Sequence, residues 1–271
     1  MTANAESSAE SGLLEVRSLV KSFGGVKAVS ELDMTVREGE IHALIGPNGS
    51  GKTTTLNVVS GLYRATSGSV RFRGEELTQL PPHTIAARGI TRTFQNIRLF
   101  AKLSVLENVL IGRHTRLRTN FFSALVPNAM TSKEEEDARE RALELLRFVG
   151  LADRANARAG SLAYGDQRRL EIARALAAEP SLLLLDEPAA GMNPAETDAL
   201  VRLLHAVRAR GITLLLIEHD MNLVMSISDR ITVLNFGTHI AEGPAQSIST
   251  NPDVITAYLG GPLDVGAAAT R

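Results

Sequence analysis

The sequence predicts an α/β protein in which a parallel sheet is joined by an antiparallel β layer and a helical segment. The apolar run Ile41–Ile45 precedes a glycine-rich loop and a segment of helical character. The runs 182–185 and 212–217 are continuously apolar, which is typical of strands buried on both faces. Residues 32–37 and 70–73 instead alternate apolar and polar side chains, as half-buried antiparallel strands do.

The loop after the first apolar run matches the pattern G-x-x-x-x-G-K-[ST] without a gap. Its glycines let backbone N–H groups and a helix N-terminus face an anion. The lysine then contacts the β- and γ-phosphates, and the following threonine hydroxyl is a ligand for Mg²⁺. A plain glycine-rich turn would not require the strand before it and the helix behind it. We therefore predict a P-loop NTPase core of the RecA-like type, with a nucleotide site formed by Gly46, Pro47, Asn48, Gly49, Ser50, Gly51, Lys52, Thr53 and Thr54.

Length and composition favour one large domain with subdomains. The chain has 271 residues, of which 44% are hydrophobic and 22% charged, and its formal net charge is −1. This balance does not indicate a nucleic-acid partner. Cysteine is absent and no apolar run is long enough to cross a bilayer, so we expect a cytoplasmic protein. We also expect a disordered lead-in over 1–12, a single domain over 13–260 and a flexible tail over 261–271.

Residues 97–178 are predicted to form the helical subdomain. Ser104 and Glu107 fit a capping box, and a second helix is expected to begin at Ser132 and end at Gly150. The acidic opening of that second helix, residues 134–137, is interpreted as a solvated face rather than a binding site. The side chains expected to point inward are Ala138, Leu145, Leu146 and Val149.

Further helices and a hairpin are predicted in the second half of the chain. A helix is expected after Gly165 and through Ala178, and the Asn193-Pro194 pair marks the start of another. The segments 231–234 and 239–241 are expected to pair as a hairpin, and Asn251-Pro252 to open a short final helix.

Two aromatic features each have two open interpretations. Phe23, in the loop that follows the first predicted strand, is placed to stack on a nucleotide base, but it is equally consistent with an ordinary core aromatic. Phe121 and Phe122 lie in a stretch without helical or strand periodicity. This pair is about equally consistent with a contact site for a partner protein and with local packing into the core.

Polar side chains follow the predicted strands at the edge where α/β sheets place ligand groups. Asp186 comes after four leucines and is expected to hold Mg²⁺, usually through water, together with Thr53 and Gln95. Glu187 is the candidate general base for hydrolysis, the alternative being a surface acid. His219 ends the next strand and is expected near the γ-phosphate, although a lone histidine is more often structural. Gln95, Glu187 and His219 are thus the predicted catalytic side chains.

The order of these motifs resembles the ATP-binding subunits of ABC transporters over residues 14–260. The matching elements are the Walker A loop 46–53, the Q-loop glutamine Gln95, the signature 162–166, the Walker B run 182–186, Glu187, the D-loop 191–194 and the switch histidine His219.

This resemblance implies an ABC-type ATPase with ATP and Mg²⁺ as cofactors. It implies a second ABC ATPase subunit facing the first head to tail, so that each ATP lies between one Walker A loop and the opposite signature. The signature residues acting on the partner's nucleotide would be Ser161, Ala163, Tyr164, Gly165 and Asp166. Ala163 departs from the usual serine, Asp166 from the usual glutamine, and Asn193 of the D-loop stands where an aspartate is common.

The resemblance narrows to the ATP-binding subunits of branched-chain amino acid importers. The segments that carry it are 93–100, 162–165, 186–191 and 251–260. It implies membrane permease partners, an indirect solute-binding protein outside the membrane, and a peripheral position on the cytoplasmic face of the inner membrane. The alternatives are an importer of urea or short amides, lipid-linked export, and a soluble ABC protein acting on DNA or ribosomes.

Overall fold

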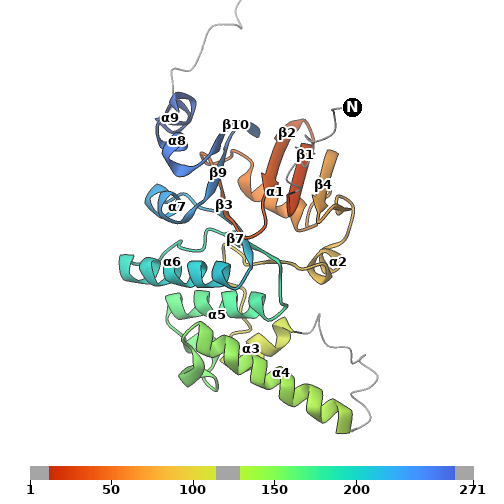
Figure 1. Ribbon diagram of the computed structural model, residues 1–271, viewed down its shortest axis with the longest axis vertical. Helices are drawn as coiled ribbons and strands as arrows, with labels where there is room; N and C mark the ends of the chain where they lie inside the picture. Colours follow the sequence, from red (N-terminus) through yellow and green to blue (C-terminus); the bar gives the residue numbers. More distant parts are fainter. Residues whose placement is uncertain (1–11, 114–128, 260–271) are drawn as a thin grey trace, which may run out of the picture.

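A computed structural model describes residues 12–113 and 129–259, and it confirms the predicted α/β architecture (Figure 1). Two sheets lie beside one another in the upper and middle parts of the molecule, and most helices pack below and beside them. Phe121 and Phe122 lie outside the described residues, so the two interpretations of this pair stay open.

The larger sheet has six strands in the order β10-β9-β3-β8-β7-β6. All neighbouring pairs are parallel except β9 with β10, which form the predicted antiparallel hairpin. The strands nearest the middle are buried along their whole length because they carry almost only leucine, isoleucine and alanine. The bounds are β3 Ile41–Ile45, β6 Ile90–Arg92, β7 Leu182–Asp186, β8 Thr213–Ile217, β9 Arg230–Asn235 and β10 Thr238–Gly243.

The smaller sheet is antiparallel and has the order β2-β1-β4-β5. Its alternating sequence places one row of side chains, including Val16, Leu32 and Val70, in a core shared with helix α1 (Lys52–Val59) and with β7. The strands are β1 Leu14–Phe23, β2 Val26–Val36, β4 Ser67–Phe72 and β5 Glu75–Glu76.

Helices cover the larger sheet and form a second core against it. The apolar faces of α5 and α6 pack on β7 and β8 in one cluster that also includes residues of α3 (Val105–Gly112) and α4 (Ala129–Phe148). The predicted cap of α6 is confirmed, since Asn193 and Glu196 form a capping box. The bounds are α1 Lys52–Val59, α2 Pro82–Ala87, α5 Tyr164–Leu176, α6 Pro194–Ala209, α7 Met221–Ile227, α8 Ala245–Ser249 and α9 Pro252–Leu259.

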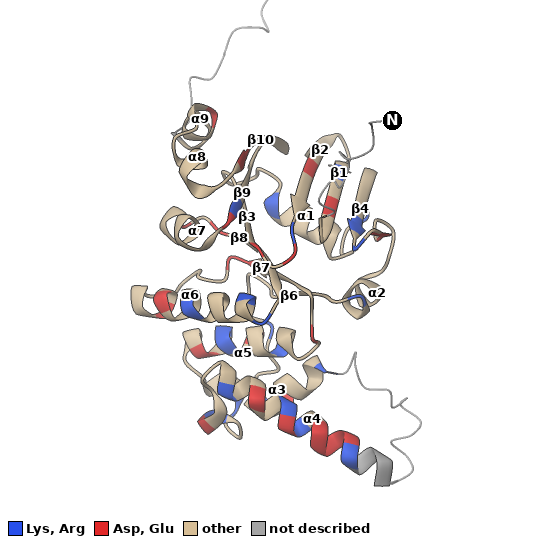
Figure 2. Cartoon of the chain, viewed as in Figure 1, with Lys and Arg blue, Asp and Glu red and all other residues tan. Residues whose placement is uncertain are grey.

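Helices α3 (Val105–Gly112) and α4 (Ala129–Phe148) lie at the end of the molecule farthest from the antiparallel sheet (Figure 1). The predicted capping box at Ser104 is confirmed. Helix α4 begins at Ala129, not at Ser132 as predicted, and the signature helix α5 ends at Leu176 rather than Ala178. Charged residues are dense along α4 (Figure 2), and Glu135, Glu136 and Asp137 are exposed, as expected of a solvated face. Of the side chains expected inward, Ala138, Leu146 and Val149 are buried and Leu145 half-buried.

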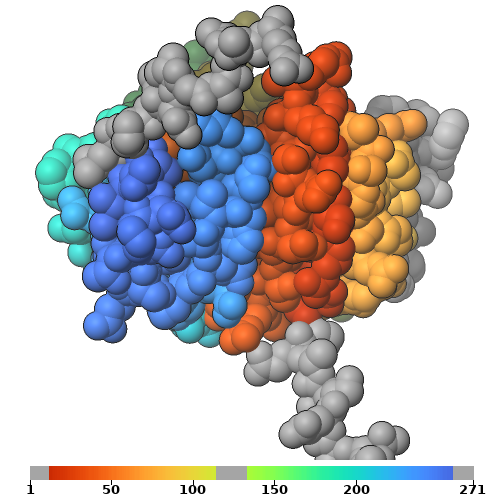
Figure 3. All heavy atoms as spheres, turned by 90° about the horizontal axis from the view of Figure 1, so that it is seen from above, coloured from red at the N-terminus to blue at the C-terminus, as the bar shows by residue number. Residues whose placement is uncertain are grey.

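The last elements of the chain return to the nucleotide-loop end of the sheet. Viewed from above, β9, β10, α8 and α9 form a band beside the strands β1 and β2 (Figure 3). The turn between β9 and β10 contacts the phosphate loop, because the Gly237 N–H donates to the Ser50 carbonyl at 3.1 Å. Within the described residues, no helix is long and apolar enough to cross a membrane.

Candidate functional site

The phosphate loop lies between β3 and α1, as the motif requires. Gly46 has φ 148°, and a Cβ there would lie 2.0 Å from the Leu234 carbonyl oxygen, so no side chain fits. Gly51 has φ 99° and is the N-cap of α1, where a Cβ would lie 2.4 Å from the Ala28 carbonyl oxygen. The two glycines therefore let the loop pass between the β9–β10 turn and strand β2. Loops of this kind can turn backbone N–H groups toward an anion.

Lys52 is buried and bends back over its own loop. Its ammonium group donates to the carbonyl oxygens of Gly46 at 2.7 Å and Pro47 at 2.9 Å. Burial lowers the pKa of Lys52, and the nearby carboxylates of Glu187 and Asp186 act in the opposite direction. The ammonium group is thus held against the phosphate loop, where the negative charges of Asp186 and Glu187 attract it.

Gln95, Glu187 and His219 come together at the carboxyl edge of the larger sheet. The Gln95 side-chain amide donates to Glu187 Oε2 at 2.8 Å, and His219 Nδ1 lies 3.9 Å from the same oxygen. Glu187 has φ 47°, an unfavourable conformation for a residue with a side chain. Such strain, about 1–3 kcal/mol, is found most often at functional sites. The three side chains predicted to be catalytic therefore form one cluster.

Asp186 lies deeper than this cluster. Its side chain is 3% exposed, and Oδ2 accepts a hydrogen bond from Arg92 at 2.7 Å. The other oxygen, Oδ1, is buried and has no hydrogen-bond partner within the described residues. An orphaned carboxylate oxygen of this kind is suited to a cation.

The residues present fit a Mg²⁺ ion that is bound together with nucleotide phosphates. Asp186 offers a free carboxylate oxygen and the Thr53 hydroxyl is on an exposed residue at the first turn of α1. Across residues 12–113 and 129–259, no group of three His, Cys, Asp or Glu side chains is placed to hold a metal alone. Mg²⁺ usually takes one or two carboxylates and completes its shell with phosphate oxygens and water, so this small donor set is sufficient.

Glu218 is a buried residue at the site to which sequence reasoning gave no role. Its two carboxylate oxygens accept hydrogen bonds from the backbone N–H groups of Ala189 at 2.8 Å and His219 at 3.1 Å. Burial raises the pKa of Glu218. Glu218 thus links the segment just before the D-loop to the backbone of His219. The only indication of this role in the sequence is that Glu218 directly follows a predicted buried strand.

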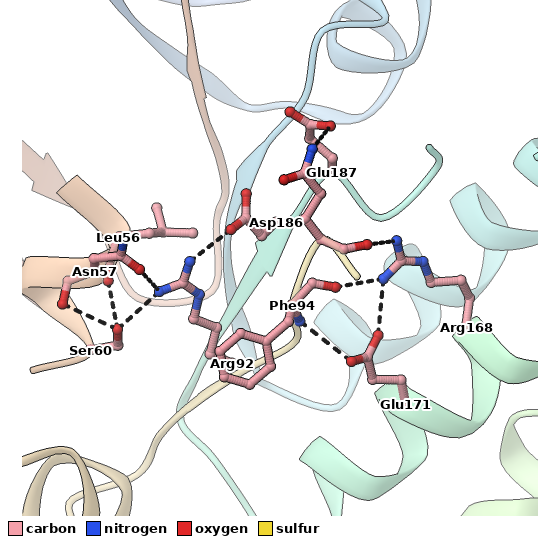
Figure 4. A network of polar contacts seen from close by, with 10 residues as sticks. Leu56, Asn57, Ser60, Arg92, Phe94, Arg168, Glu171, Asp186 and Glu187 are labelled. Atoms are coloured by element: carbon pink, nitrogen blue, oxygen red, sulfur yellow. Dashed lines mark hydrogen bonds and ion pairs between the residues drawn. The ribbon is translucent and has the colours of Figure 1, made fainter. Parts of the chain in front are cut away.

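The segment from Arg92 to Gln95 is held to the signature helix by a second buried pair. The guanidinium group of Arg168 donates to the carbonyl oxygens of Phe94, at 2.7 Å, and of Gln95. The same group pairs with Glu171 at 3.0 Å, and both side chains are at most 2% exposed. Figure 4 shows this pair on one side of the segment and Arg92 with Asp186 on the other.

The signature residues surround the N-terminus of α5. Ala163 is the N-cap and has no side chain to cap the helix, while Gly165 is buried. Asp166 pairs with Arg169 one turn later, so its negative charge is balanced within the helix. Tyr164 is exposed and lies 3.5 Å from the Cβ position of Gly191 in the D-loop. Ser161 is exposed, and its hydroxyl donates to the Arg158 carbonyl at 2.8 Å.

Phe23 is not a core aromatic. The residue is 46% exposed, and its ring packs edge-on against that of Tyr63, with a centroid distance of 5.3 Å. The Lys21 ammonium lies 4.7 Å from the same ring centroid. An exposed ring that is fixed in this way can offer a face to a nucleotide base.

A family model described as "ABC transporter" matches residues 29–190 of the chain. The chain belongs to the ABC transporter ATP-binding family. The cassette is therefore an ATP-hydrolysing enzyme that binds ATP. A second family model, described as "Branched-chain amino acid ATP-binding cassette transporter", matches residues 238–264.

Two bacterial relatives match nearly the whole cassette. The branched-chain amino acid transport ATP-binding protein BraF of Pseudomonas aeruginosa is 49% identical over 92% of this chain and 98% of its own. The corresponding protein LivG of Escherichia coli K12 is 48% identical with the same coverage.

Solved structures share the fold. The ADP conformation of an ATP-binding cassette of an ABC transporter is 33% identical with a TM-score of 0.80, covering 92% of this chain and 98% of that one. A dimeric post-hydrolysis cassette bound to ADP and Pi is 27% identical with a TM-score of 0.72, covering 86% of this chain and 98% of that one.

Replacing Glu187 with glutamine is expected to slow ATP hydrolysis by roughly 10²–10⁴-fold, the usual range for losing a general base. ATP affinity should be retained, because Lys52 and the loop backbone are untouched. Steady-state hydrolysis and direct nucleotide titration measure the two effects separately. A surface variant, Glu76→Gln, serves as the control, and near-normal turnover in Glu187→Gln would move the catalytic role to His219.

Replacing Phe23 with alanine is expected to weaken ATP and GTP binding alike. Base stacking contributes about 1–3 kcal/mol and tolerates any base, since every base has a π-face. The unmodified cassette should for the same reason hydrolyse GTP within about tenfold of ATP, a gap of ~1.4 kcal/mol. Competition titrations with the two nucleotides measure the affinities, and steady-state hydrolysis of each nucleotide measures the relative rates. A thousandfold preference for ATP, or loss of ATP affinity alone in the variant, would reveal a base-specific contact elsewhere.

Proposed function

We propose that this cassette is the ATP-hydrolysing subunit of an importer for branched-chain amino acids. The observation that carries the proposal is the 49% identity to BraF, which extends over 92% of the chain. The match of residues 238–264 to the branched-chain cassette model adds support from a separate segment, because it lies beyond the ABC model match. The solute itself is expected to contact the membrane partners rather than this subunit.

We infer the roles of the site residues from their positions. The N–H groups of the phosphate loop and Lys52 would bind the phosphates of ATP. Thr53, Asp186 and Gln95 would hold Mg²⁺, which neutralises charge on the β- and γ-phosphates when it is bound. Glu187 would accept the proton of the attacking water, and His219, 3.9 Å from Glu187, would orient the γ-phosphate or that water.

A second cassette is expected to complete each site. The signature, Ser161 to Asp166, lies at the N-terminus of α5, where backbone N–H groups favour an anion. In the head-to-tail arrangement that the family resemblance implies, this end meets the phosphates held by the other cassette. The solved relative with a dimeric structure bound to ADP and Pi supports a dimer here. The partner would be a second copy or a sister subunit.

A groove of about 430 Å³ beside the Q-loop segment is suited to the membrane permease. It lies between α2, β6, the end of α3 and α5, and the exposed side chains of Leu62, Phe100 and Ile111 line it. Exposed apolar side chains around a groove are typical of protein contacts. A permease segment seated there would place the cassette on the cytoplasmic face of the inner membrane, with a solute-binding protein acting on the other side.

Transport in proteoliposomes tests the proposed solute. The cassette would be reconstituted with its permease subunits and solute-binding protein, with ATP enclosed, and Glu187→Gln used as the inactive control. We expect ATP-dependent uptake of labelled leucine that isoleucine and valine compete against. Uptake of urea or a short amide without leucine would support the alternative importer. Co-purification with ribosomes or DNA in place of a permease would overturn the transport function.

A further inference from the structure

Arg92 is a buried cation beside the carboxylate expected to bind Mg²⁺. Its Nη2 lies 2.7 Å from Asp186 Oδ2, and the two side chains are only 7% and 3% exposed. Arg92 is the last residue of β6 and Asp186 the last of β7, and these neighbouring parallel strands place both at one edge of the sheet. A pair so far from solvent is held in a defined geometry, unlike the mobile ion pairs of a surface.

The other terminal nitrogen of Arg92 contacts helix α1. Nη1 donates to Asn57 Oδ1 at 2.6 Å and to Ser60 Oγ at 3.1 Å (Figure 4). Helix α1 begins at Lys52, so both acceptors lie one to two turns behind the phosphate loop. One planar guanidinium group therefore links β6, β7 and α1. Strand β7 ends at Asp186, α1 carries Thr53, and Gln95 follows three residues after the end of β6. A lysine could contact any one of these partners but not all three in a fixed plane.

The link leaves one oxygen of Asp186 free. Because Oδ2 is taken by Arg92, the carboxylate cannot rotate without breaking a buried charge-assisted hydrogen bond. Oδ1 is buried without a partner within the described residues, and it points away from Arg92 (Figure 4). The arrangement has the form of a metal ligand whose second oxygen is fixed by an outer-shell group.

We propose that Arg92 is a positioning residue for the Mg²⁺ site, which fixes Asp186 relative to Thr53 and Gln95 through its contacts with Asn57 and Ser60. The inference rests on the proposed role of Asp186 in holding Mg²⁺. A positioning role and a purely electrostatic role of Arg92 predict opposite changes in Mg²⁺ affinity when Arg92 is removed. Loss of a nearby positive charge would strengthen the attraction of the site for Mg²⁺. Loss of positioning weakens it, because the carboxylate is no longer held in place.

The test compares nucleotide affinity with and without metal. A fluorescent, non-hydrolysable ATP analogue is titrated into the whole cassette in EDTA and at saturating Mg²⁺, and the ratio of the two affinities gives the metal-dependent gain. In Arg92→Met, we expect affinity in EDTA within about twofold of the unmodified protein, and the gain reduced about tenfold to 100-fold. A gain that is unchanged or larger in the folded variant overturns the proposal.

A control variant and two milder variants accompany Arg92→Met. Arg88→Met removes a surface arginine, paired with Glu75 at 2.9 Å, and should leave both affinities unchanged. Arg92→Lys and Asn57→Ala retain a charge next to Asp186 and should each reduce the gain by a smaller factor. If thermal unfolding shows that Arg92→Met does not fold, these two decide the matter, and a gain equal to that of the unmodified protein in both contradicts the proposal.

The variant Asp186→Asn tests the proposed Mg²⁺-binding role of Asp186 separately from the positioning role of Arg92. If that variant keeps the full metal-dependent gain, Asp186 does not hold Mg²⁺ and the proposed role of the carboxylate fails together with this inference. If Asp186→Asn loses the gain while Arg92→Met, Arg92→Lys and Asn57→Ala keep it, the carboxylate role stands and only the positioning role of Arg92 is wrong.

Discussion

Burial of the central strands constrains where chemistry can occur in this molecule. Strands β7 and β8 are covered on both sides, and their interiors consist of leucine and isoleucine, because an unpaired polar side chain there would cost about 1–3 kcal/mol or more. Polar groups are therefore displaced to the strand ends. As the strands are parallel, these ends meet at one edge, where Asp186, Glu187, Glu218 and His219 are found. The same edge receives the phosphate loop from β3.

Buried charge then links this edge to the helical part of the chain. The four-residue segment from Arg92 to Gln95 is bound on one side to Asp186 and α1, and on the other to Arg168 and Glu171 of the signature helix. A displacement of Gln95 would disturb both sets of contacts. Hydrogen bonds that involve charged groups each contribute about 1.5–3 kcal/mol to stability, so these contacts hold the segment in a fixed position between the two parts of the protein. It joins the nucleotide edge to the groove proposed for the permease.

Much of this could be predicted from the sequence, because glycine geometry and strand periodicity are local properties. The phosphate loop, the central strands and the caps of α3 and α6 follow from such patterns. The clustering of Gln95, Glu187 and His219 follows from a second rule, that parallel strands bring the residues after their carboxyl ends to one edge of the sheet. The role of Arg92 was not predictable, since its partners are 35 and 94 residues distant. Asp166, a departure from the family pattern with no physical explanation in the sequence alone, is balanced by Arg169. Helix α4 begins three residues before the predicted start at Ser132, because the Ser132 and Glu135 pair has the spacing of a capping box but lies inside a longer helix.

Each nucleotide site is proposed to require two cassettes, one giving the phosphate loop and Glu187 and the other the signature. The most direct measurement is the specific ATPase activity of the purified cassette as a function of its own concentration. If two cassettes share each site, activity per molecule rises with concentration below the dissociation constant of the dimer, and total activity therefore increases faster than linearly. Strict proportionality down to concentrations at which sedimentation shows only monomer would contradict the shared site.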